Sequence, residues 1–379
     1  MININNPVEC CGCSACVERC PKSCISFDED KEGFRYPEVD VSRCIECGLC
    51  EKVCPVINEN GPNEIKTVTA AWIKNETIRK DSSSGGVFTA IAADVLNKGG
   101  VVFGARYDER YEVCHSYVEM VDQLALFRGS KYMQSRIGNS YLKAEQFLKQ
   151  GREVLFTGTP CQIAGLKLFL RKDYENLYTV DIICHGVPSP KVWRKYLDKI
   201  VEKDFGGISP EKLTDVNFRF KDPSWTDYKL KISTEQHDVI ESKSANPYNQ
   251  AFNMNVTLRP ICYSCPFKDG KSGSDITIAD FWGIQKVDSS MNDDRGTSMV
   301  IMHNCRIKLP DSVEAKSEPI ESVARYNGSY YHSAAYNGNR VVLFGHLDKS
   351  KDIISLMNRC TKPSFPDRLK NVIYRRLHK

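Results

Sequence analysis

The sequence predicts an α/β protein whose body has a mixed, largely parallel sheet and is preceded by a small α+β module. From Thr67 onward, apolar runs typical of strands alternate with runs of helical periodicity, the pattern of strands joined by helices. Before that point the composition differs, since ten of the 17 cysteines lie between Cys10 and Cys54. A polar stretch containing Gly61 and Pro62 separates the two parts and is typical of a linker.

The composition is that of an ordinary soluble chain, with 41% hydrophobic and 26% charged residues among 379. No apolar run approaches the ~18 residues that cross a bilayer. The net charge of +4, from 52 basic and 48 acidic residues, is too balanced to indicate a nucleic-acid partner. Met1 to Pro7 lacks the features of a secretory signal. We therefore expect a cytoplasmic protein with reduced thiols, not a disulfide framework.

The module repeats one cysteine spacing twice. Each run reads C-x2-C-x2-C-x3-C followed by proline, and the two runs are Cys10, Cys13, Cys16, Cys20 and Cys44, Cys47, Cys50, Cys54. This is the spacing of bacterial two-cluster ferredoxins, in which the fourth cysteine of each run ligates the other cluster. We predict two 4Fe-4S clusters, the first held by Cys10, Cys13, Cys16 and Cys54, and the second by Cys44, Cys47, Cys50 and Cys20.

Zinc is the alternative, because paired C-x2-C knuckles commonly bind it. Four cysteines within eleven residues, twice, each set ending in Cys-Pro, are unusual for zinc. Between the runs, residues 25–40 alternate apolar and polar side chains around Gly33, which predicts a hairpin. Cys11 and Cys24 fall outside the spacing, and we interpret both as small packed residues and not as ligands.

In the body, several runs predict strands and helices in alternation. Strands are expected over 67–73, 101–107, 152–158 and 177–184, and helices over 85–100, 137–151, 159–170 and 189–203. Residues 216–233 predict antiparallel strands with a turn at Asp222-Pro223, and residues 247–260 lead helically to a cysteine pair. In the loop before the helix at 85–100, Ser84 is expected to cap the helix. The exposed backbone N–H groups of such a loop can hold a flavin phosphate, although a plain cap is the simpler interpretation.

Four further cysteines have positions that suggest a third site. Cys161 lies in the first turn of a helix, after Thr159 as cap and Pro160 as first residue, where a thiolate is favoured. Cys184 ends a strand, and Cys262 and Cys265 have C-x2-C spacing. A third 4Fe-4S cluster is one hypothesis; zinc at the same positions, or Cys161 as a nucleophile without metal, are the others. The isolated residues Cys114, Cys305 and Cys360 are expected to be structural.

Together these motifs resemble one known family. The module, with "SSSGGVFTAI", "RGSKYMQS", "LFTGTPCQIAGLK", "DIICHGVPSP", "CYSCPFK" and "SDITIADFWGI", is similar to the family of beta subunits of deazaflavin (factor-420) hydrogenases and dehydrogenases, from Val8 to about Cys305. The resemblance implies an iron–sulfur flavoprotein that contains FAD or FMN. It supports the third cluster, and it implies flavin contacts from Ser83, Ser84, Gly85, Gly86, Gly129, Ser130 and Lys131. Lys131 would donate to the flavin's carbonyl edge or phosphate, the alternative being a solvated lysine, and Asp280 and Trp282 would lie near the cluster or the flavin.

The implied function is a ferredoxin-linked, flavin-dependent oxidoreductase. It would pass electrons between the clusters and a soluble two-electron carrier or organic substrate, with a link to polysaccharide biosynthesis suggested by single-chain relatives. No residue is assigned a catalytic step. The alternatives are a non-catalytic electron-transfer subunit of a larger redox complex and a zinc-stabilised interaction protein. Expected partners are a redox carrier such as ferredoxin, a small-molecule substrate, and a second copy or a redox-complex subunit.

The expected domain division follows from these assignments. A two-cluster ferredoxin domain occupies 1–60, the flavin-binding body occupies 67–150 and 151–310, the latter part carrying the third-cluster cysteines, and a C-terminal extension occupies 311–379. The extension ends in a basic amphipathic pattern, with Leu369, Ile373 and Leu377 at helical spacing. Such a helix docks on an anionic membrane, on a partner, or on its own domain, and the last is what we expect.

Overall fold

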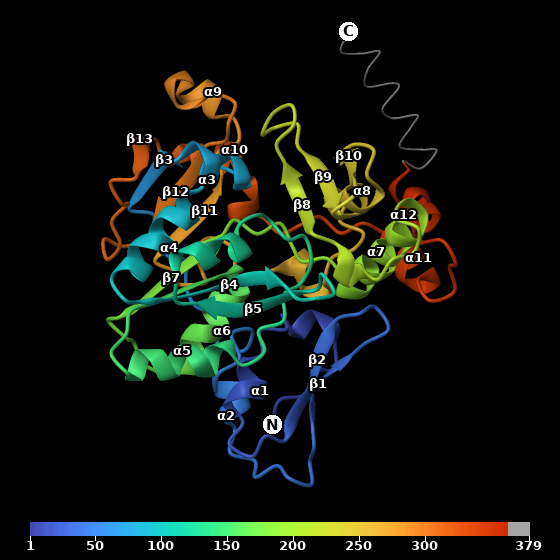
Figure 1. Cartoon of the computed structure of the whole chain (residues 1–379). Coiled ribbons are helices and arrows are strands. Elements are labelled where there is room, and N and C mark those ends of the chain that lie inside the picture. The colour runs from blue at the N-terminus through green and yellow to red at the C-terminus, as the bar shows by residue number, and fades with distance from the viewer. Residues whose placement is uncertain (363–379) are drawn as a thin grey trace, which may run out of the picture.

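The structure, a computed structural model, describes residues 1–362. The predicted basic helix near the C-terminus lies outside the described residues. The N-terminal module, dark blue in Figure 1, packs beneath a larger body. Its elements are the turn η1 (Pro7–Glu9), the helices α1 (Ala15–Arg19) and α2 (Leu49–Lys52), and the strands β1 (Ile25–Glu29) and β2 (Arg35–Val39). None of the helices within residues 1–362 is both long enough and apolar enough to span a membrane.

Strands β1 and β2 form an antiparallel hairpin, which confirms the prediction for this segment. Asp30 shapes the turn, because its carboxylate accepts hydrogen bonds from the backbone N–H groups of Glu32 and Phe34. Gly33 has a φ of 87°, a conformation that glycine adopts without a steric penalty. The module is followed by residues 59–66, which contain no helix or strand, as expected of a linker.

The body is built on an eight-stranded mixed sheet, so the predicted fold class is confirmed. Its order is β13-β3-β12-β11-β7-β6-β4-β5. The strands are β3 (Thr67–Ile73), β4 (Val101–Tyr107), β5 (Val113–Val118), β6 (Val154–Gly158), β7 (Leu177–Ile182), β11 (Ile276–Asp280), β12 (Ser298–Met302) and β13 (Val313–Glu318). The central strands β4, β6, β7 and β11 are parallel, and the pairs on both flanks are antiparallel. The parallel part is therefore the centre of the sheet and not most of it.

Helices cover both faces of this sheet. They are α3 (Glu76–Asp81), α4 (Val87–Asn97), α5 (Ser140–Lys149), α6 (Pro160–Leu170), α9 (Ile284–Val287) and α10 (Glu321–Tyr326), with the 3-10 turns η2 (Val121–Phe127) and η5 (Ser289–Met291). Val102 and Leu155 point to the α4 side, whereas their neighbours Phe103 and Phe156 pack with α5 and α6. Both side-chain sets of the central strands are buried, which explains why these strands read as continuous apolar runs.

A second, three-stranded antiparallel sheet lies beside the first (Figure 1). Its strands are β8 (Asp215–Phe220), β9 (Lys229–Ser233) and β10 (Asp238–Ser242). The elements packed with it are α7 (Pro190–Asp204), α8 (Pro247–Asn253), α11 (Asn339–His346), α12 (Ile353–Thr361) and the turn η3 (Pro210–Lys212). Of the remaining turns, η4 (Pro260–Ser264) contacts η1 of the module and η6 (Gly328–Tyr330) contacts α10. The predicted antiparallel pair is confirmed. The helix expected over 247–260 forms only over Pro247–Asn253 and ends before the cysteine pair. Trp193 and Phe218 anchor a shared core with α12. The domain division itself stays a prediction.

One local prediction is wrong. Ser84 does not cap α4, because the capping position is occupied by Gly86 in the left-handed region, with a φ of 78° and no side-chain cap. The hydroxyl of Ser84 instead donates to the backbone carbonyl of Thr297, at 2.8 Å. The loop before α4 is therefore held by the neighbouring strand region, a long-range contact that local sequence cannot reveal.

Candidate functional site

All 17 cysteines carry free thiols, so each is available as a ligand. One group surrounds a small cavity in the module. The cavity is lined by the four residues predicted for the second cluster, Cys20, Cys44, Cys47 and Cys50. The last cysteine of the first run thus reaches the second run, as the ferredoxin spacing implies. Cys24 also lines the cavity, with its Sγ 3.3 Å from that of Cys20.

A second group comprises the residues predicted for the first cluster, Cys10, Cys13, Cys16 and Cys54. Burial raises the pKa of the Cys16 thiol, and the nearby thiols of Cys10 and Cys54 raise it further. The backbone N–H of Gly12 donates to Cys10 Sγ at 3.3 Å. Hydrogen bonds to the sulfurs are among the factors that set the potential of a 4Fe-4S cluster. The thiols of Cys13 and Cys16 are each close enough to other members of this set to affect one another's pKa, and four neighbouring thiols are the donor set of such a cluster.

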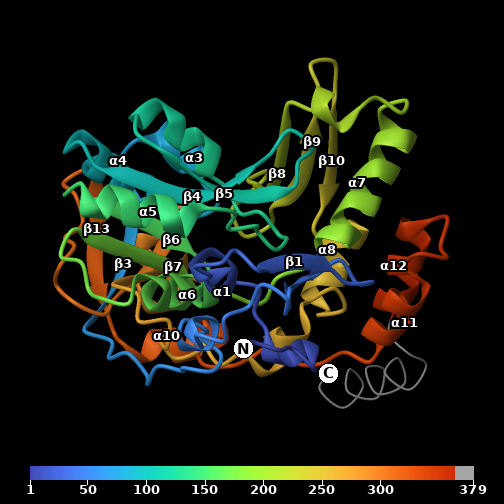
Figure 2. The same cartoon turned by 90° about the horizontal axis from the view of Figure 1, so that it is seen from below.

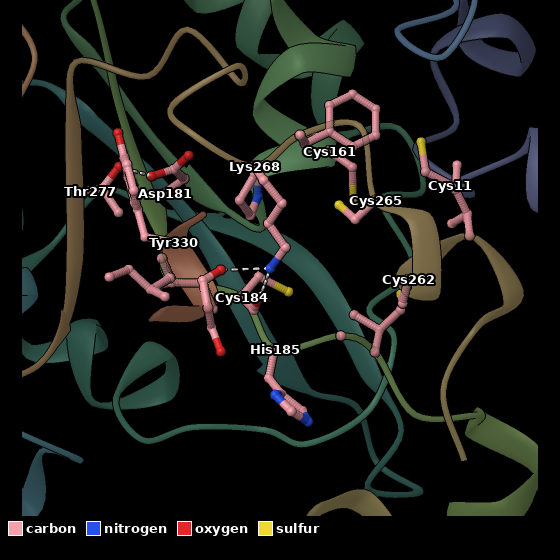
Figure 3. A pocket seen from close by; sticks show the side chains of 18 of the residues that line it. Cys11, Cys161, Asp181, Cys184, His185, Cys262, Cys265, Lys268, Thr277 and Tyr330 are labelled. Carbon is pink, nitrogen blue, oxygen red and sulfur yellow. Dashed lines mark hydrogen bonds between the residues drawn. The ribbon is translucent and has the colours of Figure 1, made fainter. Parts of the chain in front are cut away.

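A third group lies where the module meets the body (Figure 3). Its cavity is lined by Cys161, Cys184, Cys262 and Cys265, the four residues of the predicted third site. Cys161 lies in the first turn of α6, Cys184 follows β7, and the other two lie in and directly after η4. Strands β6 and β7 are parallel neighbours, so residues that follow their carboxyl ends meet at one edge of the sheet.

The start of α6 agrees with its prediction. Thr159 is the N-cap residue and Pro160 the first helical residue. The side-chain oxygen of Gln162 accepts a hydrogen bond from the Thr159 backbone N–H at 2.9 Å. The Thr159 hydroxyl lies 3.2 Å from Cys161 Sγ. This turn therefore fixes the thiol of Cys161 toward the third cavity.

The alternatives for this third group differ in what they require. A nucleophilic Cys161 needs a lowered pKa, whereas contact with the Cys11 thiol, followed by burial, raises the pKa of Cys161 well above its usual range. Among residues 1–362, no three Cys, His, Asp or Glu side chains are placed to hold a single metal ion. Zinc would require the four sulfurs to converge on one point, about 2.3 Å from each.

Cys11 has a position that its spacing did not indicate. It is buried, as expected, but it lines the third cavity beside Cys161. Its thiol contacts those of Cys13 and Cys161. The contact with Cys13, together with burial, raises the pKa of Cys11 well above its usual range against the opposing effect of Cys161. Cys11 therefore lies between the ligand set of the first cluster and that of the third.

A larger cavity of ≈ 540 Å³ lies next to the third group. Its volume falls in the range of roughly 300–1,000 Å³ typical of cofactor sites. Residues 182–187, which include Cys184 and Gly186, line both this cavity and the cysteine cavity. The two cavities therefore share a wall.

The two loops predicted to contact a flavin come together in this larger cavity. Ser83 Oγ accepts hydrogen bonds from the backbone N–H and the hydroxyl of Ser130, at 2.7 and 3.0 Å. The predicted residues that line the cavity are Ser83, Ser84, Gly86, Gly129, Ser130 and Lys131. Gly85 instead faces the sheet, where its N–H donates to Ser298 Oγ at 3.0 Å.

Lys131 is not a freely solvated lysine. Its Nζ donates to the backbone carbonyls of Arg128 and Gly129, at 2.9 and 3.2 Å. Burial lowers the pKa of Lys131 to about 7, against a smaller opposing effect of Asp215. This buried amine, which lines the larger cavity, fits an anionic or carbonyl-rich edge of a flavin.

The cavity has further polar residues that sequence reasoning did not single out. Arg219, 4% exposed, pairs with Asp280 at 2.8 Å, and its guanidinium lies over the rings of Tyr228 and Trp282. Asp280 and Trp282 line the cavity, close to where the family motif suggested. His115 is buried between Ser135 Oγ at 2.6 Å and the Thr157 carbonyl at 3.0 Å. No motif in the sequence marks Arg219 or His115, because both contact residues far along the chain.

Comparison with known protein families gives separate matches for the module and for the body. A sequence model described as "4Fe-4S dicluster domain" matches residues 9–58. Two further models describe the N-terminal and C-terminal parts of the beta subunit of coenzyme F420 hydrogenase/dehydrogenase, and they match residues 68–140 and 151–310. The three matches together extend over most of the module and the body.

The individual relatives have low sequence identity to this chain and match only part of it. The chain is 25% identical over 182 residues to a subunit of the F(420)H(2) dehydrogenase of Methanosarcina mazei, covering 45% of this chain and 51% of the relative. It is 26% identical over 187 residues to Coenzyme F420-dependent sulfite reductase of Methanocaldococcus jannaschii, covering 47% and 28%. The chain thus matches about half or less of the length of these relatives.

A solved structure of the F420-reducing [NiFe] hydrogenase complex from Methanosarcina barkeri, with xenon derivatization, contains a chain that matches 84% of this one and 94% of its own length, at 17% identity and a TM-score of 0.44. The family rests on the sequence models and their agreement with the cysteine runs. This chain belongs to the family of coenzyme F420 hydrogenase/dehydrogenase beta subunits and carries a 4Fe-4S dicluster domain at its N-terminal end.

Proposed function

We propose that the chain is an iron–sulfur flavoprotein oxidoreductase. In this proposal the module holds two 4Fe-4S clusters, and Cys161, Cys184, Cys262 and Cys265 hold a third. A flavin, FAD or FMN, binds in the larger cavity against the loops at residues 83–86 and 129–131. Electrons pass between a one-electron carrier at the module and a soluble two-electron carrier or organic substrate at the flavin.

The observation that carries the proposal is the shared wall between the two cavities. Cys184 and its neighbours line both, so a cluster ligated by Cys184 is adjacent to a flavin in the larger cavity. On the other side, Cys11 brings the third group into contact with the first cluster's ligand set. In this proposal the first cluster, the third cluster and the flavin therefore lie in one series.

The flavin supplies the exchange between one-electron and two-electron chemistry, since clusters move single electrons and organic reductions need pairs. The chain's residues would bind and orient the flavin. The two serine-containing loops are tied together at Ser83 and Ser130, and Lys131 presents a buried amine. Arg219, paired with Asp280, lies beside the first of these loops, where its Nη2 donates to the Ser83 carbonyl at 3.5 Å. These groups favour a ring system with electron-rich edges.

The first carrier to test is coenzyme F420, because the family description and both relatives' names contain it. An organic substrate other than F420 is the alternative acceptor. Cluster potentials span about −700 to +450 mV, so the ligand sets alone do not determine the direction of electron flow.

The decisive experiment is anaerobic purification followed by iron, sulfide and flavin analysis of one sample. We expect about twelve irons per chain, from four in each cubane, plus one flavin. About eight irons would remove the third cluster from the proposal. Colourless material without iron that does not take up FAD or FMN would refute it entirely.

A second candidate is a non-catalytic electron-transfer subunit of a larger redox complex. It is favoured by the name of one relative, a subunit of F(420)H(2) dehydrogenase. This candidate predicts that the three clusters are present while the larger cavity takes up no flavin. Flavin titration of the iron-loaded chain, followed by fluorescence quenching, separates the two functions.

A further inference from the structure

Arg259 is a fully buried arginine between the module and the body. It is 0% exposed and immediately precedes η4, the turn that carries Cys262. Its Nε donates to the Cys10 carbonyl at 2.7 Å and its Nη2 to the Arg35 carbonyl at 2.9 Å, both in the module. Its Nη1 donates to Gln134 Oε1 at 2.9 Å. Every acceptor of this guanidinium is therefore a neutral oxygen.

The other buried arginines are arranged differently. Arg79 pairs with Asp293 at 2.7 Å, Arg219 with Asp280 at 2.8 Å, and Arg340 forms a two-bond ion pair with Glu32. Within residues 1–362, no carboxylate lies within ion-pair distance of Arg259. Among the buried arginines of residues 1–362, Arg259 therefore differs in having no carboxylate to balance its charge.

A buried charge without a partner is energetically costly, so a compensating charge is expected nearby. The groups around Arg259 are sulfurs and an aromatic ring. Burial acts to lower the pKa of Arg259, but the thiols of Cys10, Cys11 and Cys262 and the hydroxyl of Tyr36 outweigh it. Cys10 belongs to the first ligand set and Cys262 to the third, and Arg259 lines the third cavity. A cluster held by four thiolates carries net negative charge, which increases on reduction.

The cysteine loop of the module is shaped around this guanidinium. Gly12 has a φ of 71°, and a Cβ there would lie 2.9 Å from Arg259 Nη1 and 2.7 Å from Gln134 Nε2. The plane of the guanidinium is covered by Tyr36, with its central carbon 4.3 Å from the ring centroid. The guanidinium of Arg259 is therefore held in one position by the residues packed around it.

We propose that Arg259 is a positioning residue that supplies the positive charge shared by the first and third clusters. It raises both reduction potentials together, because net charge near a cluster is one of the factors that set its potential. An electron that crosses from module to body then moves between two sites stabilised by the same cation. This inference rests on the proposed function, since it requires both clusters.

The test is an anaerobic redox titration of the iron-loaded full chain, followed by electron paramagnetic resonance. In Arg259→Gln, the midpoint potentials of the first and third clusters shift to lower values. The midpoint potential of the second cluster, held by Cys20, Cys44, Cys47 and Cys50, does not change. Arg259→Lys keeps the charge and restores the midpoints toward the wild-type values. The wild type's iron content is measured first, so that a missing third cluster, which contradicts the proposed function, is recognised separately.

A second variant avoids removing the arginine. Gln134→Glu places a carboxylate on the acceptor of Arg259 Nη1 and provides the missing counter-charge. We expect the same two midpoints to fall. The control is the double variant Glu32→Gln/Arg340→Gln, which removes a neutral ion pair across the same interface and should leave the midpoints unchanged. The proposal is overturned if Gln134→Glu shifts no midpoint, or if the control shifts them equally. If Arg259→Gln loses iron, the midpoint potentials of Gln134→Glu alone test the proposal.

Discussion

Cys184 lies in the wall that separates the cysteine cavity from the larger cavity, so it contributes to both. Its thiol belongs to the group of the third cavity, while the segment around it also lines the larger cavity. Lys268 fixes this segment, because its Nζ donates to the carbonyls of Cys184 and Ser329, at 2.6 and 2.7 Å (Figure 3). The residue can therefore ligate a cluster on one side while the segment around it borders the larger cavity on the other.

Substitution of this cysteine tests the third cluster. Cys184→Ser should reduce the iron content by about four per chain, from about twelve to about eight, because one cubane loses a ligand. The flavin content should persist, because serine is close to cysteine in size and the loops at residues 83–86 and 129–131 are unchanged. Iron and sulfide analysis measures the effect, and Cys305→Ser, at an exposed cysteine remote from the three groups, is the control. Unchanged iron in Cys184→Ser would contradict the assignment.

Asp181, also on β7, is a buried carboxylate that lines the third cavity. It accepts hydrogen bonds from Thr277 Oγ1 at 2.5 Å and from Ser272 Oγ at 2.6 Å. Burial raises the pKa of Asp181 to about 6, against the opposing effect of these hydroxyl groups. The folded protein therefore binds a proton between pH 4 and pH 6 that the unfolded chain has already released.

The sign of the resulting pH dependence follows from linkage. Because the pKa of Asp181 is higher in the folded state, its contribution to stability is present below its usual value near 3.8 and is lost as pH rises through about 6. Asp181→Asn should remove this loss, which amounts to about 3 kcal/mol over the whole titration and to about 2 kcal/mol between pH 4.5 and pH 7. Urea unfolding of both proteins at pH 4.5 and pH 7 measures the difference. A parallel pH dependence in the two would contradict the prediction.

At the scale of elements, the loop before α4 illustrates a conflict between local and long-range requirements. Its serines and glycines suggested a capping turn, but the loop is pinned to the sheet through Gly85. The Gly85 carbonyl accepts from Ile73 N–H at 2.8 Å, and its N–H donates to Ser298 Oγ. The loop thus faces the cavity with Ser83 and Ser84 because Gly85 faces the strands.

A methyl group at Gly85 should disturb this arrangement. A Cβ there would lie 2.3 Å from the Ala71 carbonyl oxygen and 2.8 Å from Ser298 N, both backbone atoms. Gly85→Ala should therefore destabilise the fold by about 1–3 kcal/mol and weaken flavin uptake. Denaturant unfolding and flavin titration are the measurements. Gly61→Ala, at a position with no atoms within 4 Å of the added Cβ, should change neither.

At the scale of the whole molecule, the module is docked on the body by contacts spread along its length. Helix α1 packs on α6 (Figure 2), and Arg19 pairs with Glu145 of α5 at 3.3 Å. At the hairpin, Glu32 pairs with Arg340 of α11. These contacts hold the module against the body at separate points along its length.

Removal of one charge from the hairpin contact tests this docking. Glu32→Gln leaves Arg340 without its carboxylate in a largely buried position and should cost about 2–5 kcal/mol at the interface. Hydrogen exchange in β1 and β2 should accelerate, while exchange in the central sheet stays slow. Glu38→Gln, at an exposed position on β2, is the matched control. Equal exchange in both variants would show that the ion pair does not hold the hairpin.

The sequence by itself determined what depends on spacing within short segments. The cysteine runs indicated two clusters, and the strands at residues 67–73 and 101–107 and the helix that begins at Pro160 were predicted from periodicity and capping residues. These features form from neighbours within a few positions, so local pattern is sufficient. The motifs also identified the family.

The tertiary structure decided which distant residues meet. It placed Cys11 between two ligand sets, Arg259 without a carboxylate beside both, and Cys184 in a wall shared by two cavities. Each of these contacts joins segments that are more than 100 residues apart or depends on which strands are neighbours. Packing and electrostatics select such contacts over the whole chain, and no local spacing encodes them.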